Sequence, residues 1–599
     1  MIYKKLKILF NKNQLLKLYG ILLGSILAAF FEVVGIGSIP VFAMLIIDIE
    51  SLLTKVSTYI SIDFLLGFEE STLIIFGASL LALIFIIKNL YLFLLLFFQG
   101  KLIKELRSST SNKLYKYYIN SPYLKHLNQN PAILIRTMQS DIGNTFTFIL
   151  SYIMLIRENL ILFSIFLLLI FADPLISIFS FLSLVVPVLL FYYLYKNTLK
   201  ARGKILQEQL GKKIKNINQS LGAIKETKIL NRENLFLNIF LKLNDKVEKM
   251  IFFSYLISSS PRLFLEVMAL FTVAVISSIL IFIGRSPETI LPLISLLSVS
   301  AVRFIPALNV ITSSLTNIRF QKPSFDLVVD EIEKLNLTEY SDVQNKQFYN
   351  NKNEDFSLRN NILIKDISFS YESGKRTEIN DITINIKKGT SVGLIGRSGS
   401  GKSTLVDIIL GLLEPNKGGI YVDDKNINIL KSYWHKQIGY IPQDIYLLDD
   451  TIRNNITFGL QEDKINEKFL SEAIKVSQLE NFVKLLPDKL NTIVGNRGVR
   501  ISGGEKQRIG IARALYNKPK VMILDEATSS LDLDNENKIL EEINENKDDK
   551  TLIIISHRNN TVKYCDLIYV IEQGNIIDYG PYKKIMEKHK YLKENKIIH

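Results

Sequence analysis

The sequence has almost no cysteine: Cys565 is the only one among its 599 residues. A single thiol cannot form a disulfide within the chain, and it places no redox constraint on the compartment. We also find no lipidation motif and no cleavable signal peptide. The first apolar run, about residues 19–47, far exceeds the roughly 7–15 residues of a signal-peptide core, so we expect a retained membrane helix.

Apolar residues, in contrast, are abundant and lie mostly in the first half of the chain. The mean hydropathy is +0.21 over 599 residues, too apolar and too long for one soluble domain. Buried helices of a large soluble protein are the alternative, but those are usually shorter and amphipathic. We predict a transmembrane domain over residues 1–331 with six helices, each reaching the ~20 residues that cross a bilayer: about 19–47, 72–100, 146–171, 175–195, 263–284 and 289–316.

The chain is strongly basic, with a formal net charge of +14. Such a balance suits nucleic acid, an acidic membrane surface or loops held in the cytoplasm. Lysine and arginine cluster before the first run, after the second and after the fourth, whereas the intervening loops are acidic or nearly uncharged. This asymmetry predicts a multi-pass protein of the inner or plasma membrane, with a cytoplasmic N-terminus and no nucleic-acid partner.

The connections between the runs differ in length. The outer ones, residues 48–70 and 172–174, are short. The inner ones are long and rich in Lys and Glu, which predicts membrane helices that continue into the cytoplasm. Each has a bend, at residues 121–123 and 218–222, where we expect a short transverse helix. Residues 51–64 place apolar side chains at helical spacing, so they form either an amphipathic helix on the outer membrane surface or a packed loop.

Several ionisable residues fall inside the apolar runs, where a charge is costly and therefore indicates function. Their cations are candidates for a wet cavity that accepts an anionic head group: Lys88, Arg157, Arg262 and Arg303. The alternative is mutual pairing, for example of Glu266 with Arg303 or of Arg157 with a neighbouring acid, while Arg262 reaches toward the interface.

The second half contains a phosphate-binding loop of the form G-x-x-x-x-G-K-[ST]. Residues 390–395 before it are apolar and residues 404–412 after it have helical periodicity, so the motif has the strand and helix that it requires. A glycine-rich turn with a chance lysine is the alternative. We predict a linker at 332–360 and an ATP-binding domain at 361–599. The loop consists of Gly396, Arg397, Ser398, Gly399, Ser400, Gly401, Lys402, Ser403 and Thr404.

In such a loop, backbone N–H groups turn toward the phosphates and the following helix adds the positive end of its dipole. Lys402 would reach the β- and γ-phosphates, and Ser403 would hold Mg²⁺. A second apolar strand, residues 521–524, ends in two carboxylates. Asp525 would lie beside Mg²⁺, and Glu526 would orient or deprotonate the attacking water.

These motifs together resemble the ATP-binding cassette (ABC) family. Residues 501–508, Ile-Ser-Gly-Gly-Glu-Lys-Gln-Arg, are similar to its signature motif, and residues 494–498 are similar to the X-loop of its exporters. Asn496 and Glu505 depart from these patterns, in which Glu and Gln are common. The other matches are the Q-loop residue Gln443, the D-loop residue Asp532, the switch residue His557 after an apolar strand, and the adenine-stacking residue Tyr371.

The resemblance implies an exporter half-transporter, a six-helix all-α transmembrane domain followed by an α/β P-loop domain. In this family two chains sandwich ATP between the phosphate loop of one and the signature of the other, here Ser502, Gly503 and Gly504. With intact catalytic positions, it implies a homodimer that hydrolyses ATP with Mg²⁺. It assigns catalysis to Glu526, Gln443 and His557, the metal to Ser403, Gln443 and Asp525, and further nucleotide contacts to Tyr371 and Asp532.

Within the exporters, the chain resembles the bacterial PglK-type lipid-linked oligosaccharide flippases. The similarity lies in the acidic connection with its 51–64 segment, in residues 222–233 and in the three cations Lys88, Arg262 and Arg303. It implies that the chain flips a polyprenyl-pyrophosphate glycolipid to the outer leaflet, with these cations on the pyrophosphate and the lipid tail in the bilayer. The alternatives are an exporter of peptides, drugs or lipid A, and a non-transporting regulatory cassette protein.

Overall fold

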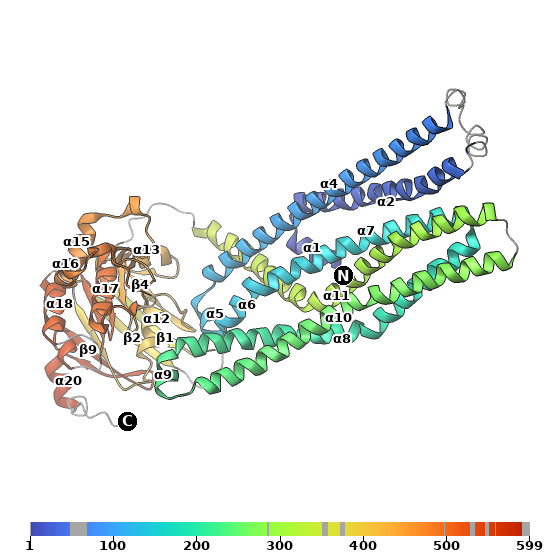
Figure 1. Ribbon diagram of the computed structural model, residues 1–599. Coiled ribbons are helices and arrows are strands. Elements are labelled where there is room, and N and C mark those ends of the chain that lie inside the picture. The colour runs from blue at the N-terminus through green and yellow to red at the C-terminus, as the bar shows by residue number, and fades with distance from the viewer. Residues whose placement is uncertain are drawn as a thin grey trace. The chain divides into compact units, whose positions relative to one another are not determined.

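The structure, a computed structural model, divides into two compact units. The first comprises Met1–Ser121 and Lys125–Asn345, and the second Pro122–Leu124 and Lys346–His599. Figure 1 shows long helices in the first unit, whereas all strands of the described residues belong to the second unit. The structure describes residues 2–47, 49, 69–283, 287–349, 357–371, 378–495, 498–526, 533–545, 550–556 and 559–589.

Long helices dominate the first half of the chain because its apolar runs are long and contain few charged residues. Five helices of the described part are long and apolar enough to cross a membrane. They contain the first five predicted runs, except that the helix with the fifth run ends at Phe282, before the predicted residue 284. The sixth run falls within one further long helix. The helices are α1 Ile2–Leu9, α2 Lys12–Ile47, α4 Glu70–Asn120, α5 Tyr123–Asn128, α6 Pro131–Arg136, α7 Ile142–Ala172, α8 Pro174–Gly222, α9 Ile224–Ile229, α10 Glu233–Phe282 and α11 Pro287–Tyr349.

The predicted extensions of the apolar helices into polar sequence are present, and so are the two bends. Helices α4, α8 and α10 continue well beyond their apolar runs into polar sequence. Ser121 ends α4 in an extended conformation, φ −65° and ψ 146°, because the following Pro122 disfavours a helical residue before it. The short helices α5 and α9 follow the two bends. The 51–64 segment lies outside the described residues, and α11 carries the helix through part of the predicted linker to Tyr349.

A turn of π-helix, residues Thr137–Asp141, places a buried carboxylate among three helices. Asp141 accepts hydrogen bonds from Arg136 Nε at 2.9 Å, from Gln207 Nε2 of α8 at 3.1 Å and from Ser324 Oγ of α11 at 2.7 Å. Because the charge is paired and its lone pairs are used, the cost of burying it is offset. This cluster fixes α6, α8 and α11 against each other. Helices α2 and α4 run side by side, as do α8 and α10 (Figure 1).

The second unit is built on a six-stranded sheet with the order β10-β9-β3-β8-β7-β6. Five of its strands are parallel and only β10 is antiparallel. Every residue of β3 and β8 is buried, as expected for strands covered on both faces. The strands are β3 Ser391–Ile395, β6 Ile438–Ile441, β7 Val521–Asp525, β8 Thr551–Ile555, β9 Leu567–Glu572 and β10 Asn575–Gly580.

A second, antiparallel sheet has the order β2-β1-β4-β5, with β1 Asn361–Phe369, β2 Ile379–Lys387, β4 Lys417–Val422 and β5 Lys425–Asn426. The helices of this unit are α12 Lys402–Ile409, α13 Lys431–Gln437, α14 Ile452–Thr457, α15 Glu467–Val476, α16 Glu480–Leu485, α17 Gly503–Tyr516, α18 Leu533–Glu545, α19 Asn559–Val562 and α20 Tyr582–Lys588. The register pairs Leu394 with Ile555 and Asp525 with Ile555, so β3, β7 and β8 end at one edge of the sheet. The predicted fold class, an all-α membrane-type domain followed by an α/β domain, is confirmed.

Candidate functional site

A polar pocket of about 310 Å³ lies at that edge of the six-stranded sheet. It brings the phosphate loop between β3 and α12 together with residues that follow β6 and β7. The predicted residues that line it are Gly396, Ser398, Gly399, Gly401, Lys402, Ser403, Thr404, Gln443, Asp525 and Glu526, and Glu378 and Ile555 join them. Residues far apart in the sequence therefore meet as the motifs predict.

Two glycines of the loop are required by close backbone approaches. Gly401 has φ +100°, and a Cβ there would lie 2.6 Å from the carbonyl oxygen of Glu378. A Cβ on Gly396 would lie 2.1 Å from the carbonyl oxygen of Ile571. Only glycine fits at either position, since it has no side chain. The chain can therefore turn tightly between β3 and α12 and expose its N–H groups.

Lys402 is buried at the start of α12, and its ammonium group is held by the loop itself. Its Nζ donates to the carbonyl oxygens of Gly396 and Arg397, both at 2.9 Å. Burial lowers the pKa of Lys402, and the carboxylates of Glu526 and Asp525 oppose that shift. A phosphate would offer this cation charged acceptors in place of neutral carbonyls, which strengthens its hydrogen bonds.

Asp525 ends β7 and Glu526 follows it, and the two carboxylates have different surroundings. Glu526 has φ +50°, a conformation uncommon for residues other than glycine, and its N–H donates to the carbonyl of Ile555 at 2.9 Å. Gln443 Nε2 donates to Glu526 Oε2 at 2.9 Å. Burial raises the pKa of Asp525, and the neighbouring charge of Glu526 raises it further, whereas Tyr440 and Lys402 lower it.

The pocket has the donor set that Mg²⁺ requires. The hydroxyl of Ser403, the amide oxygen of Gln443 and the carboxylate of Asp525 all belong to residues that line it. Mg²⁺ prefers such hard oxygen ligands and is usually held by one or two carboxylates together with phosphates and water. A nearby cation would also favour the ionised form of Asp525, whose burial otherwise disfavours its charge. These residues therefore fit the ion.

Comparison with known proteins shows what the chain around this pocket resembles. Residues 379–529 match the family model described as ABC transporter. The solved structure of a bacterial Atm1-family ABC exporter with ATP bound superposes with a TM-score of 0.73, covering 96% of this chain and 97% of the other at 18% identity. This chain has the fold of an ABC exporter. The ABC transporter domain carries the pocket, and an ABC transporter domain binds ATP, typically with Mg²⁺.

Several known exporters and flippases align with part of this chain, over part of their own length. An ATP-dependent lipid A-core flippase of Wigglesworthia glossinidia brevipalpis is 40% identical over 232 residues, which is 38% of this chain and 40% of that protein. The leukotoxin translocation ATP-binding protein LktB of Mannheimia glucosida is 37% identical over 256 residues, 42% of this chain and 36% of that protein. A putative multidrug export ATP-binding/permease protein of Staphylococcus aureus is 39% identical over 228 residues, 38% of this chain and 39% of that protein. The aligned part thus spans less than half of each relative.

The signature residues of the ABC transporter domain lie away from the phosphate pocket of the same chain. Ser502 caps α17: its hydroxyl accepts from the N–H of Glu505 at 3.3 Å, and Glu505 Oε2 accepts from the N–H of Ser502 at 2.7 Å. This capping box explains why Glu is well suited to position 505. Ser502, Gly503 and Gly504 are not among the residues that line the described pocket.

Three other predicted nucleotide-site residues lie outside the matched range 379–529 and have different outcomes. Tyr371 packs edge-on against Phe369, with ring centroids 5.0 Å apart, and is not among the pocket-lining residues. Asp532 and His557 lie outside the described residues, as does Asn496 of the X-loop motif. Their roles remain predictions.

The cations of the apolar helices lie in two locations, a buried set of ion pairs and an exposed surface. Glu32 of α2 accepts from Lys88 Nζ of α4 at 3.3 Å and pairs with Arg303 Nη2 of α11 at 3.0 Å. Glu158 of α7 joins them, with Arg157 Nη2 at 2.8 Å and Arg303 Nη2 at 3.8 Å. We call these five residues the buried charge cluster. The predicted pairing of Arg157 with a neighbouring acid is confirmed, and the acid is Glu158. The predicted pairing of Arg303 with Glu266 is wrong, since Arg303 pairs with Glu32.

Arg262 does not join the buried charge cluster. Its Nε donates to Glu266 Oε1 at 2.9 Å, one helical turn along α10, and its side chain is 63% exposed. The structure therefore brings Lys88 and Arg303 together through Glu32 and leaves Arg262 on a separate, exposed surface of the same unit.

Arg513 was missed in the sequence because its function depends on tertiary contacts. It lies in α17, within the ABC transporter domain, and donates to the carbonyl oxygens of Asn455 at 2.8 Å and Tyr446 at 3.0 Å. Its guanidinium lies 4.4 Å from the ring centroid of Phe458, and burial lowers its pKa to about 10. It thereby fixes the signature helix to α14. Only an arginine shortly after the signature serine hinted at this role.

Asp407 of α12 was also missed in the sequence, and its raised pKa allows a prediction about the stability of the second unit. Burial raises its pKa to about 6, and the charge of Asp525 contributes. The ionised form is therefore disfavoured in the folded state, so stability falls as pH rises from about 4 to about 6. Asp407→Asn should stabilise the second unit at pH 7.5 by about 1–2 kcal/mol, after discounting for partial exposure, and by almost nothing at pH 4.

The fluorescence of Trp434 measures this effect. It is the only tryptophan of the chain and is fully buried in the second unit. Asp463→Asn, at an exposed position in the same unit, is the control and should change stability at neither pH. If Asp407→Asn were less stable than the parental chain by the same amount at both pH values, the carboxylate would be needed for the fold, contrary to this account.

Proposed function

We propose that this chain is an ATP-driven exporter of the inner or plasma membrane, with its N-terminus and ATP-binding domain in the cytoplasm. The observation that carries the proposal is the pocket in which Lys402, Ser403, Asp525 and the Gln443–Glu526 pair meet. Phosphoryl transfer needs positioning and charge stabilisation more than covalent chemistry, and these residues supply both.

The residues of the pocket have three tasks in the proposed hydrolysis: binding the phosphates, holding Mg²⁺ and activating water. The loop N–H groups and Lys402 bind and orient the β- and γ-phosphates. Ser403, Gln443 and Asp525 would hold Mg²⁺, which neutralises developing charge on the phosphate oxygens. Glu526 accepts the proton of the attacking water, and its hydrogen bond to Gln443 at 2.9 Å orients its carboxylate.

The working form that we propose is a homodimer. One chain places its signature residues at the start of α17, and they do not line its own described pocket. A second copy would supply Ser502, Gly503 and Gly504 to the phosphates, with α17 presenting its N-terminus to the anion. Since the described catalytic positions Lys402, Asp525 and Glu526 are intact, two identical chains suffice.

The substrate that we propose is a lipid-linked oligosaccharide or a related polyprenyl-pyrophosphate glycolipid, moved from the inner to the outer leaflet. A pyrophosphate cannot cross hydrocarbon unaided because its charge is costly to desolvate. The buried charge cluster has three cations and two carboxylates, so it retains one positive charge for an anionic group. Lys88 and Arg303 are its candidates for the pyrophosphate, with Arg262 as a peripheral one.

The relatives include flippase, toxin and multidrug exporters, so the substrate class needs a direct test. We would measure ATP hydrolysis by the chain in lipid nanodiscs with polyprenyl-pyrophosphate glycans, lipid A, peptides or drugs added separately. The glycolipid should raise the rate several-fold and the other compounds should not. Stimulation only by lipid A, peptides or drugs would overturn the glycolipid proposal.

Variants of the cluster test the same proposal at the residue level. Lys88→Ala and Arg303→Ala should remove most of the glycolipid stimulation. Either variant leaves Glu32 and Glu158 at least one cationic partner each, so basal hydrolysis should persist and shows that the chain is folded. Lys249→Ala is the matched control, because Lys249 pairs with Asp245 on an exposed part of α10. Full stimulation in both cluster variants would show that these cations do not bind the pyrophosphate.

A further inference from the structure

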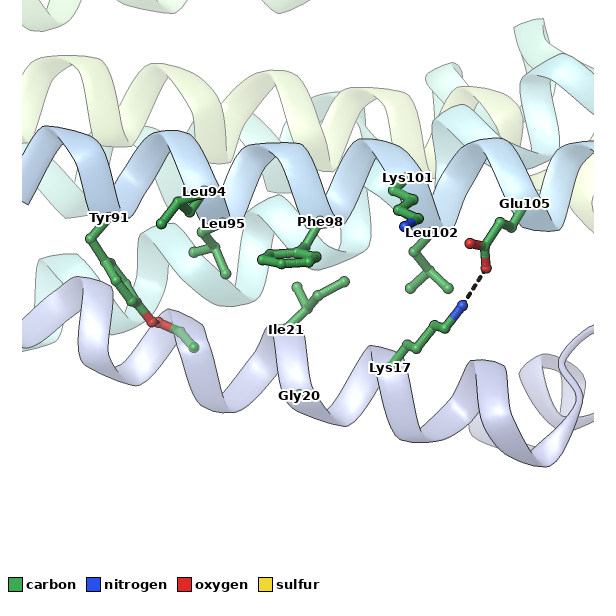
Figure 2. A pocket seen from close by; sticks show the side chains of 11 residues that line it. Lys17, Gly20, Ile21, Tyr91, Leu94, Leu95, Phe98, Lys101, Leu102 and Glu105 are labelled. Carbon is green, nitrogen blue, oxygen red and sulfur yellow. Dashed lines mark hydrogen bonds and ion pairs between the residues drawn. The ribbon is translucent and has the colours of Figure 1, made fainter.

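A groove of about 460 Å³ lies between α2 and α4 in the first unit (Figure 2). Its walls are almost wholly apolar, with Ile21, Leu94 and Phe98 among them. Its volume falls in the range of about 300–1,000 Å³ that is typical of small-molecule sites. We propose that this groove binds an acyl chain of an anionic phospholipid from the cytoplasmic leaflet, whose phosphate contacts Lys101.

The groove exists because α2 has small residues where it faces α4. A Cβ on Gly20 would meet no heavy atom within 4 Å, so a depression is open at that position. One turn further on, Gly24 is approached closely: its carbonyl oxygen accepts from the hydroxyl of Tyr91 at 2.8 Å. This hydrogen bond satisfies the polar atom of Tyr91 and leaves its ring as part of the apolar wall.

The charged residues of the groove lie at one end and Tyr91 at the other, as Figure 2 shows. Lys17 Nζ donates to Glu105 Oε2 at 2.5 Å, so these two charges cancel. Lys101 supplies the remaining positive charge. An amphiphile with a long apolar part and a net anionic end matches this arrangement. A zwitterionic lipid brings its own cation beside its phosphate, which weakens the attraction for Lys101, and a cationic amphiphile offers Lys101 no counter-charge.

The position of the groove along the helices selects the leaflet. Lys17 precedes the apolar run of α2 and Lys101 follows the apolar run of α4, so both lie where each helix leaves the hydrocarbon core. Basic residues at this place are typical of the cytoplasmic side. Leu94 is 45% exposed and Phe98 54% exposed, so lipid in that leaflet has direct access to the groove.

A tryptophan placed in the groove tests this proposal in the full chain. Phe98→Trp introduces a reporter in the wall, and Phe97→Trp introduces one at the neighbouring exposed phenylalanine, which does not line the groove. Trp434, the native tryptophan, is buried in the second unit and gives a constant background. We would add phosphatidylglycerol or phosphatidylcholine with brominated acyl chains to phosphatidylcholine nanodiscs and measure quenching.

The expected result is that brominated phosphatidylglycerol quenches the Phe98→Trp reporter at about fivefold lower mole fraction than brominated phosphatidylcholine, as one basic residue at an anionic surface implies. The Phe97→Trp reporter should show no such preference. Adding Lys101→Ala to Phe98→Trp should abolish the preference, whereas Lys104→Ala, an equal loss of charge outside the groove, should keep it. Gly20→Leu should fill the groove and reduce quenching of the groove reporter by both lipids.

Two outcomes would overturn the proposal. Equal quenching of the Phe98→Trp reporter by the two lipids would show that the groove has no anionic selectivity. Protection of that reporter from both lipids would show that protein covers the groove, as a second copy of the chain would. Neither outcome depends on ATP hydrolysis or on the exported substrate, so the proposal can fail while the proposed function holds.

Discussion

Glu526→Gln is expected to lower steady-state ATP hydrolysis by about 100- to 10,000-fold, the usual contribution of a general base. The substitution keeps the size of the side chain and its place beside Gln443 but removes the proton acceptor. It should leave ATP binding intact, because in our proposal the loop N–H groups and Lys402, and not Glu526, bind the phosphates. Hydrolysis is measured in nanodiscs, and binding is measured with a fluorescent ATP analogue on the same preparation.

The matched control for this variant is Glu462→Gln, an exposed glutamate in the same unit, which should hydrolyse ATP at the parental rate. A Glu526→Gln protein that also hydrolyses at the parental rate would remove Glu526 from the reaction. A variant that loses both binding and hydrolysis would show that the carboxylate is needed for the pocket itself.

Glu32→Ala is expected to destabilise the helical unit by about 3–5 kcal/mol, the usual cost of breaking a buried ion pair on one side. Glu32 is 2% exposed and pairs with both Lys88 and Arg303. Its removal leaves two cations in the apolar part of the unit with only Glu158 within reach of Arg303. The loss should appear as a lower midpoint of thermal unfolding, followed by circular dichroism in detergent.

Glu266→Ala provides the comparison, since Glu266 also pairs with an arginine but on an exposed surface. Exposed pairs one helical turn apart contribute only about 0.3–0.5 kcal/mol, so this variant should unfold near the parental temperature. Equal effects of the two substitutions would mean that the buried charge cluster is hydrated, and its proposed attraction for a pyrophosphate would lose its basis.

The local features of this fold could be predicted from the sequence because each depends on neighbouring residues. Long apolar runs predict α2, α4, α7, α8 and α10, and Pro122 predicts the end of α4. The phosphate loop is equally local, since glycines at 396 and 401 are required by backbone contacts and Lys402 begins a helix.

Features that depend on tertiary contacts could not be predicted in the same way. Glu32 and Arg303 are far apart in the sequence, so nothing in the chain indicates that they pair. The pair of Arg262 with Glu266 is different, because two opposite charges four residues apart on a helix are local neighbours. The pKa of Asp407 depends on burial and on Asp525, which reaches it only through the folding of the sheet. The groove at Gly20 requires α2 and α4 to be side by side.

The central claim, that the chain uses ATP to move a glycolipid across the membrane, is tested most directly in proteoliposomes. A fluorescent polyprenyl-pyrophosphate glycan is placed in both leaflets, and its accessibility to an impermeant quencher is followed after ATP is supplied on the side of the ATP-binding domains. We predict ATP-dependent movement to the opposite leaflet by the parental chain and none by Glu526→Gln. Movement at the same rate without ATP, or in Glu526→Gln, would contradict the account.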